Sequence, residues 1–186
     1  FLSKDLNIDC LYIAPGFPYE RASDKTNFLN RESIKRIFRA IFKSENFSKW
    51  KCNQTDLYLD FLAGNQSYLC NPWATPTFNI FGWQKPCYHL AEGYYKTYEE
   101  LIEKTDWKQY GNGNYEKCAD CMTHCGHEAT AVIDTFNSPF KALSKKLFGI
   151  KTVGPMIEEV SQLAARPSED VYERVLESKM YELDLM

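Results

Sequence analysis

Five of the seven cysteines are spaced in a way that suits a metal centre. Cys118, Cys121 and Cys125 stand within eight residues as Cys-x-x-Cys-x-x-x-Cys, so one loop can wrap three thiolates around a common centre. Upstream, Cys70 and Cys87 flank a segment of hairpin character, which can bring two more thiols together. Soft thiolate ligands suit both zinc and iron–sulfur clusters, so the spacing alone leaves both open.

A fifth cysteine and the aromatic, low-polarity surroundings favour a shielded redox centre over a bare structural ion, although four thiolates would satisfy zinc. We therefore expect an iron–sulfur cluster, with zinc as the alternative. In another interpretation, Cys70 and Cys87 are small buried hydrophobic residues and only the three downstream cysteines bind metal. His124 and His127 flank Cys125 and are expected to support the centre by hydrogen bonds to sulfur.

The elements that must position these residues begin with a strand and a helix. Residues Ile8–Ala14 form a short apolar run typical of a buried strand. Apolar residues at spacings of three and four predict an amphipathic helix over Arg31–Phe42, with Asn30 as its cap. A second strand over Trp50–Thr55 and a short helix over Asp56–Ala63 complete an expected α/β unit.

The cysteine-bearing part of the chain is expected to contain only short elements and one long helix. A hairpin over Thr77–Leu90 fits a stretch that prolines interrupt. A capping box predicts a brief helix over Thr97–Lys104. A longer helix over about Glu128–Leu147 is expected to kink or divide at Pro139, and a last amphipathic helix is expected from Ser168 to Leu183.

A change in composition near Gly64 divides the chain into three expected regions. Residues 1–66 hold the strand–helix units, residues 67–150 the cysteine-rich domain, and residues 151–186 a charged helical tail. The expected fold class is α/β, or more closely α+β, because strand–helix units precede a hairpin and several helices.

Composition and charge restrict the function classes. The 186 residues are 44% hydrophobic and 15% aromatic, which is enough for a real core. A net charge of -3 gives no field that would gather nucleic acid, so no nucleic-acid partner is expected. Neither a signal peptide nor a span of about 20 apolar residues is seen, and the odd number of clustered cysteines indicates a reducing compartment. The expected location is the cytoplasm.

The cysteine pattern resembles that of a known enzyme class. The pattern is similar to the twitch or SPASM-like auxiliary-cluster region of radical S-adenosylmethionine enzymes. It consists of Cys70, eleven residues, Gly82, four residues and Cys87, followed downstream by Cys118-x-x-Cys121. More narrowly, four motifs resemble the C-terminal half of the adenosylhopene transferase family, over about residues 8–134. They are Pro-Gly-Phe-Pro-Tyr-Glu-Arg-Ala at 15–22, Asp-Phe-Leu-Ala-Gly at 60–64, Phe-Gly-Trp-Gln-Lys-Pro-Cys-Tyr at 81–88 and Tyr-Glu-Lys-Cys-Ala-Asp-Cys-Met at 115–122.

This resemblance implies a hopanoid-synthesis enzyme that attaches a 5′-deoxyadenosyl group to the alkene of the triterpene diploptene. It implies that residues 1–66 are the last strand–helix units of a partial (β/α) barrel, followed by a small twitch-like domain. The complete enzyme would use S-adenosylmethionine as cofactor, take a hydrophobic triterpene, accept electrons from a donor protein and contact the membrane peripherally through its substrate. The chain would be the C-terminal portion of such an enzyme.

The resemblance also assigns ligands and exposes one departure. It implies that Cys70, Cys87, Cys118 and Cys121 hold an auxiliary 4Fe-4S cluster and leaves the role of Cys125 open. The initiating cluster of these enzymes needs a Cys-x-x-x-Cys-x-x-Cys loop, and the cysteine loop here has the reverse spacing. We therefore assign no catalytic residue and expect the chain alone to be inactive.

Two further groups are candidates for ligand contact. Tyr19, Glu20 and Arg21 lie on the loop after the first expected strand and can hold polar groups of a cofactor or substrate, although a surface ion pair fits equally well. Seven aromatic residues can line a passage for a polycyclic substrate, or else pack in the core and shield the cluster. They are Trp73, Phe78, Phe81, Trp83, Tyr88, Tyr94 and Tyr95. A standalone zinc or iron–sulfur module that binds a partner without catalysis is the alternative function.

Overall fold

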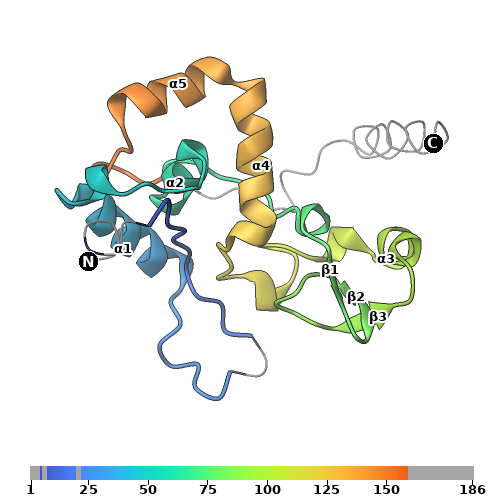
Figure 1. The fold of residues 1–186 in the computed structure, drawn as a ribbon. Coiled ribbons are helices and arrows are strands. Elements are labelled where there is room, and N and C mark those ends of the chain that lie inside the picture. The colour runs from blue at the N-terminus through green and yellow to red at the C-terminus, as the bar shows by residue number, and fades with distance from the viewer. Residues whose placement is uncertain (1–4, 6–7, 20–21, 159–186) are drawn as a thin grey trace.

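The computed structural model describes residue 5, residues 8–19 and residues 22–158. In this part of the chain, helix α4 (His124–Asn137) runs between a helical region and a small antiparallel sheet, as Figure 1 shows. The mixture of helices with one three-stranded antiparallel sheet gives an α+β architecture, which confirms the coarser part of the fold expectation. The expected helix over residues 168–183 lies outside the described residues.

Helix α2 (Asp56–Leu62) is the centre of the helical region. All its residues from Leu57 onward are buried, and it packs against α1 (Arg31–Lys43), α4 and α5 (Pro139–Phe148). An all-round buried helix needs partners on every side, which explains why three helices surround it. The core cluster consists of Ile34, Phe38, Phe42, Leu57, Tyr58, Leu59, Phe61, Leu62, Ala63, Met122 and Ala131.

Local signals set the ends of α1 and α2 as the sequence predicts. The Asn30 side chain accepts a hydrogen bond from the Ser33 amide at 2.9 Å, which caps α1. Gly64 follows α2 at a φ of 74°, a left-handed conformation that glycine adopts without strain. The spacing placed Ile34, Ile37, Phe38 and Ile41 on one apolar face, but Ile37 is 43% exposed and does not belong to the packed side of α1.

The two expected strands near the N-terminus form less ladder than predicted. The segments run parallel with a single bridge, Leu11 to Cys52, where the Leu11 amide donates to the Lys51 carbonyl at 2.8 Å. Beyond that bridge, the Gln54 side chain accepts a hydrogen bond from the Ile13 amide at 3.0 Å and donates back to the Ile13 carbonyl. A side chain thus replaces the next backbone pairing, which ends the ladder.

The expected hairpin is confirmed, and a third strand extends it. Strands β1 (Thr77–Asn79) and β2 (Gly82–Lys85) pair antiparallel, and β2 also pairs with β3 (Gly93–Tyr95). The third strand was not predicted because three residues carry no usable periodicity. Helix α3 (Tyr98–Lys104) packs on β2 and β3, and its capping residue Thr97 accepts from the Glu100 amide at 3.2 Å.

The long helix predicted after the cysteines is divided at Pro139, as expected, but it begins earlier. Helix α4 starts at His124 rather than near Glu128, with Thr123 at its N-cap. The cysteine spacing suggested a loop there, whereas tertiary contacts to residues 69–75 hold the first turn helical. Single 3-10 turns complete the described elements, namely η1 (Phe47–Lys49), η2 (Pro72–Ala74), η3 (Trp107–Gln109) and η4 (Glu116–Cys118).

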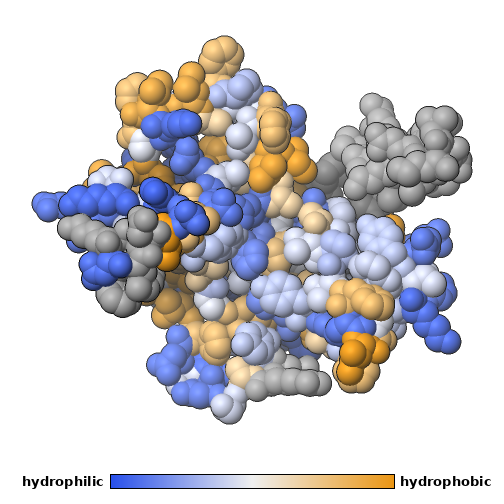
Figure 2. All heavy atoms as spheres, in the orientation of Figure 1, coloured by the Kyte–Doolittle hydropathy of each residue, from blue (hydrophilic) through white to orange (hydrophobic). Residues whose placement is uncertain are grey.

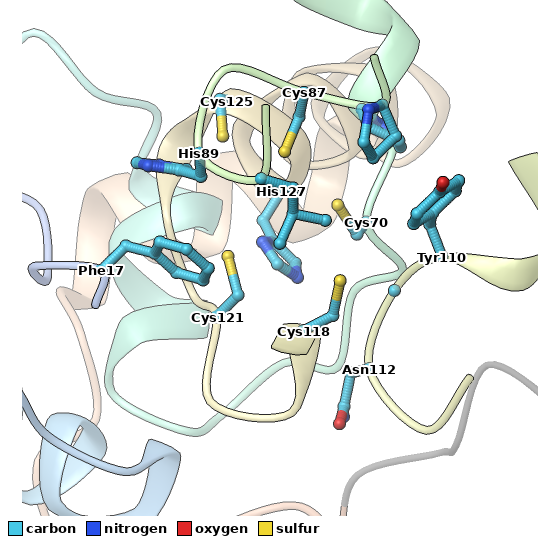
Figure 3. Close-up of a pocket in the computed structure, with 14 residues that line it drawn as sticks. Phe17, Cys70, Cys87, His89, Tyr110, Asn112, Cys118, Cys121, Cys125 and His127 are labelled. Carbon is cyan, nitrogen blue, oxygen red and sulfur yellow. The ribbon is translucent and has the colours of Figure 1, made fainter. Parts of the chain in front are cut away.

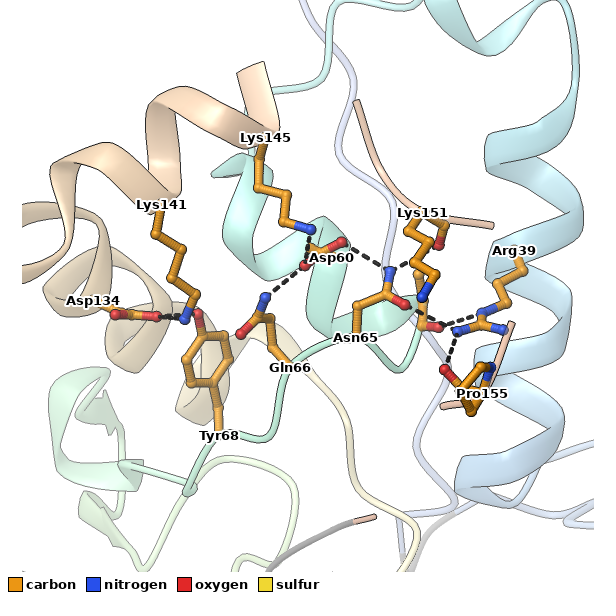
Figure 4. Close-up of polar contacts among 11 residues, drawn as sticks. Arg39, Asp60, Asn65, Gln66, Tyr68, Asp134, Lys141, Lys145, Lys151 and Pro155 are labelled. Atoms are coloured by element: carbon orange, nitrogen blue, oxygen red, sulfur yellow. Dashed lines mark hydrogen bonds and ion pairs between the residues drawn. The ribbon is translucent and has the colours of Figure 1, made fainter. Parts of the chain in front are cut away.

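A buried polar network joins α2 to α5 and to the chain after α5 (Figure 4). Asp60 is fully buried, pairs with Lys145 at 3.0 Å and accepts hydrogen bonds from Asn65 at 2.8 Å and Gln66 at 2.6 Å. Arg39 donates to the Ala63 carbonyl at 2.7 Å and to the Asn65 side chain at 2.9 Å. A buried carboxylate needs such partners, so this network fixes how α5 lies on the core. Among the described residues, no helix is long and apolar enough to cross a bilayer.

Candidate metal centre

The five cysteines singled out by their spacing meet around one cavity. Figure 3 shows their sulfur atoms directed toward a common space, although they come from three separate segments of the chain. The cavity has a volume of about 20 Å³. The lining cysteines are Cys70, Cys87, Cys118, Cys121 and Cys125. Cys10 and Cys52 do not line it.

The Cys-x-x-Cys pair is held in a compact turn by backbone hydrogen bonds. The Cys118 amide donates to the Tyr115 carbonyl at 2.9 Å, and the Cys121 amide donates to the Cys118 carbonyl at 3.0 Å. The guanidinium of Arg31, at the start of α1, donates to the Cys121 carbonyl, and the Arg31 amide donates to Asp120 at 3.2 Å. Helix α1 therefore anchors the turn from outside the cysteine-rich segment.

The third cysteine of the cluster lies on a helix rather than on the expected loop. Cys125 is buried in the first turn of α4. The hydroxyl of the N-cap residue Thr123 lies 3.2 Å from the Cys121 sulfur and 3.2 Å from the Cys125 sulfur. One hydroxyl thus links the Cys-x-x-Cys turn to the helix and keeps both sulfurs at the same wall of the cavity.

Cys70 is brought to α4 by a seam of hydrogen bonds around Gly126. The Asn71 amide donates to the Gly126 carbonyl at 2.8 Å, and the Thr75 hydroxyl donates to the Cys125 carbonyl at 2.9 Å. The Cys70 sulfur occupies the place where a side chain at position 126 would begin, so only glycine allows this approach. Sequence reasoning missed this role, although a glycine next to a clustered cysteine is a usable signal.

Cys87 follows strand β2 and is positioned by a buried glutamine. Gln84 is 6% exposed and donates from its amide nitrogen to the carbonyls of Cys87 at 3.1 Å and Tyr88 at 2.7 Å. The hairpin thus brings Cys87 to the cavity, as the sequence predicted. Gln84 itself was not predicted, because a polar residue inside a short strand gives no sign of its direction.

Burial opposes ionisation of all five thiols. Desolvation raises the pKa of Cys118 and of Cys125 to about 12, and it raises the pKa of Cys70, Cys87 and Cys121 as well. Repulsion among neighbouring thiolates adds to the increase at Cys70. A bound metal centre would supply the positive charge that thiolates in this cavity need, so metal binding there would release protons.

The arrangement differs from that of a single-ion site. Among the described residues, no three or more histidine, cysteine, aspartate or glutamate side chains are grouped closely enough to hold one metal ion. Four thiolates around zinc, each at about 2.3 Å, would stand roughly 3.8 Å apart. The five cysteines line one cavity, but among the described residues they are not grouped closely enough to hold one ion.

The three histidines have different positions. His127 is 1% exposed, lines the cavity, stacks on Phe61 at 4.9 Å and has Nδ1 3.1 Å from the Thr123 carbonyl. A carbonyl oxygen can only accept, so Nδ1 carries the proton in this contact. His89 also lines the cavity and packs against Phe17 with the ring centres 4.6 Å apart, which sequence reasoning did not foresee. His124 does not line it.

Among the described residues, the others predicted to contact a cofactor or substrate do not line the cysteine cavity. Tyr19 is 50% exposed and lines a second, open pocket beside the cysteine cavity, together with Lys25 and Lys117. Glu20 and Arg21 lie outside the described residues. None of the seven aromatic residues expected along a substrate passage lines either of these two pockets, and they pair instead with rings such as Trp107 and Tyr98 or lie exposed.

Fold and cavity together define an α+β protein with a five-cysteine candidate metal centre. The family model described as Domain of unknown function (DUF3463) matches residues 11–145, which is well over half of the chain. The chain belongs to this family, and the matched region contains all five cysteines of the cavity. No curated protein and no solved structure matches the chain.

Proposed function

We propose that the five-cysteine cavity binds a 4Fe-4S cluster. The observation that carries the proposal is the convergence of five thiols from three segments on one space, with Cys125 buried and the other four half-buried. Each thiolate of a cluster binds a different iron, which suits cysteines that line one cavity without being grouped around a single ion. The hydroxyl of Thr123, at 3.2 Å from two of the sulfurs, can stabilise bound thiolates by hydrogen bonding.

Anaerobic reconstitution tests the cluster. The protein is incubated with iron and sulfide, desalted and analysed for iron, sulfide and zinc, and the same analysis is made on protein as purified. About four irons and four sulfides per chain are expected. Stoichiometric zinc without sulfide would contradict the proposal and show that the cavity holds a structural zinc ion.

Single substitutions test the ligand set. We expect iron to be lost in Cys70→Ser, Cys87→Ser, Cys118→Ser and Cys121→Ser, and to be retained in Cys125→Ser. The matched controls are Cys10→Ser and Cys52→Ser, which lie outside the cavity and should keep full iron content. If Cys125→Ser loses iron and one of the other four variants retains it, then Cys125 is a ligand and the cysteine replaced in that other variant is not.

At the finer level, we propose that the chain is the C-terminal portion of a radical S-adenosylmethionine enzyme that adds a 5′-deoxyadenosyl group to a hopene-type alkene. The motif similarity supports this proposal. Two parallel extended segments joined through α1 also suit the last units of a partial (β/α) barrel. The cluster of this chain would then be auxiliary, with the radical-generating cluster elsewhere in the enzyme.

An activity assay separates this enzyme from a binding module. The complete gene product, with S-adenosylmethionine, a reductant and diploptene, is expected to give an adduct heavier than the alkene by one deoxyadenosyl group, detected by mass spectrometry. Absence of a Cys-x-x-x-Cys-x-x-Cys loop from the complete gene product, together with no adduct, would leave a cluster-binding module without catalysis.

A further inference from the structure

The end of α4, helix α5 and the segment after it form an apolar face at one edge of the molecule. Phe136 is 80% exposed, Phe140 86%, Leu147 68% and Phe148 85%. Figure 2 shows apolar spheres gathered over the region where α5 lies in Figure 1. Side chains this large are seldom exposed together on a soluble protein without a binding role. The exposed large apolar side chains of this region are Ile133, Phe136, Phe140, Leu143, Leu147, Phe148, Val153 and Ile157.

The contacts of α5 with the core determine which side of the helix faces outward. Lys145 pairs with the buried Asp60 at 3.0 Å, and Lys141 pairs with Asp134. Ala142 packs against the core cluster. Rotating α5 to hide Phe140 or Leu147 would break the Asp60 pair and leave a fully buried carboxylate without its cation. The exposed apolar side is therefore a fixed feature of the fold.

The charge of this region is opposite to that of the chain as a whole. Residues 133–157 contain four lysines and one acidic residue, Asp134, whereas the entire chain has a net charge of -3. Lys141 pairs with Asp134, and Lys145 pairs with Asp60. Lys146 and Lys151 are exposed beside the apolar face. Apolar side chains with neighbouring lysines are the pattern of helices that lie in the surface of a bilayer containing anionic lipids.

We propose that this face docks the protein on an anionic lipid bilayer, with α5 lying in the plane of the headgroups. The phenylalanine and leucine side chains enter the acyl boundary, and the lysines contact lipid phosphates. A second copy of the chain is a poorer occupant, because a two-fold contact through this face would bring the lysines of both copies together. This inference goes beyond the proposed function and does not depend on it.

The face is separate from the cysteine cavity, which makes the two testable independently. The cavity contains Cys125 in the first turn of α4, and the face begins at the other end of this helix. Fourteen residues of α-helix span about 21 Å. Substitutions on the face should therefore leave iron binding unchanged.

Vesicle sedimentation tests the docking face. The protein is mixed with vesicles of phosphatidylcholine alone or of phosphatidylcholine with phosphatidylglycerol, and the bound fraction is measured. We expect binding to the anionic vesicles, reduced at least about tenfold by the pair Phe140→Ser and Leu147→Ser. Lys146→Glu and raised salt should each weaken binding several-fold. Ile80→Ser is the matched control, because Ile80 is 93% exposed on the hairpin, away from α5. This variant should bind the vesicles as the unsubstituted protein does.

Two outcomes would overturn the proposal. One is the absence of binding to anionic vesicles, or binding that the Phe140→Ser and Leu147→Ser pair does not change. The other is concentration-dependent dimerisation in analytical ultracentrifugation that this pair abolishes, which would assign the face to a second copy. Circular dichroism and the iron content of the variants establish that neither result comes from misfolding.

Discussion

The helical core around α2 and the cysteine cavity at the start of α4 are built by different means. The core buries large apolar side chains and one ion pair, and its helices begin and end at local signals such as Asn30 and Gly64. The cavity is surrounded by turns and a short hairpin, held by individual hydrogen bonds. The core can therefore fold from its own burial, whereas the cavity depends on the core for its shape and on a ligand for its charge balance.

Phe61→Ala is expected to have the largest effect because Phe61 belongs to both regions. Its ring is fully buried on α2 and stacks against His127 at the cavity. Removing a buried phenylalanine side chain costs about 3–5 kcal/mol of unfolding free energy. Urea unfolding measures the loss, and iron binding should fall with it. Phe81→Ala is the control, since Phe81 is 66% exposed, and it should change stability by less than about 0.5 kcal/mol.

Asp60→Ala should weaken the core by about 3 kcal/mol, because it leaves Lys145 and two amide groups without their buried partner. The matched control is Glu32→Ala, which removes an ion pair with Arg36 whose side chains are 68% and 71% exposed. Exposed pairs contribute little, so this control should lie within about 0.5 kcal/mol of the unsubstituted protein. Equal losses in the two variants would contradict the structural role of Asp60.

Gly126→Ala should separate the two regions most clearly. The added methyl group would meet the Cys70 sulfur, so Cys70 must leave the cavity. We expect iron binding to be lost while the helical circular dichroism signal remains. Gly16→Ala is the control, because its added methyl meets only a ring edge of Phe28 at 3.2 Å, and it should retain iron. Full iron content in Gly126→Ala would show that Cys70 is not a ligand.

A pH titration of the metal-free protein should show a loss of stability at alkaline pH to which the cavity thiols contribute, beside buried tyrosines such as Tyr58, whose pKa burial also raises. Burial raises the pKa of Cys118 and Cys125 to about 12, above the ordinary value near about 8.5. A thiol whose folded pKa is raised contributes its full stability below its ordinary pKa and loses it as pH rises toward the folded value. Stability should therefore fall between about pH 9 and 12, measured by urea unfolding, and fall less steeply when both cysteines are serine. An identical slope in that double variant would contradict the burial of these thiols.

The predictable parts of this protein are those that local patterns control. Helices α1, α2 and α3, the hairpin and the division at Pro139 each follow from spacing, a cap or a proline. Two features were not predictable. The start of α4 depends on hydrogen bonds to the segment after Cys70, and the short ladder between the first two extended segments depends on the Gln54 side chain. Gln84, Arg31 and Thr123 were missed for the same reason.

By itself, the sequence determined which residues are able to bind metal and which segments are helical, because thiol chemistry and helical periodicity are properties of the residues and their near neighbours. Only the tertiary structure decided that five sulfurs from distant segments share one space, that Cys125 belongs to a helix and that Gly126 makes room for Cys70. It also decided which side of α5 remains exposed, since the Asp60 and Lys145 pair fixes that helix on the core. These outcomes depend on contacts between residues far apart in the chain, which spacing along the sequence does not encode.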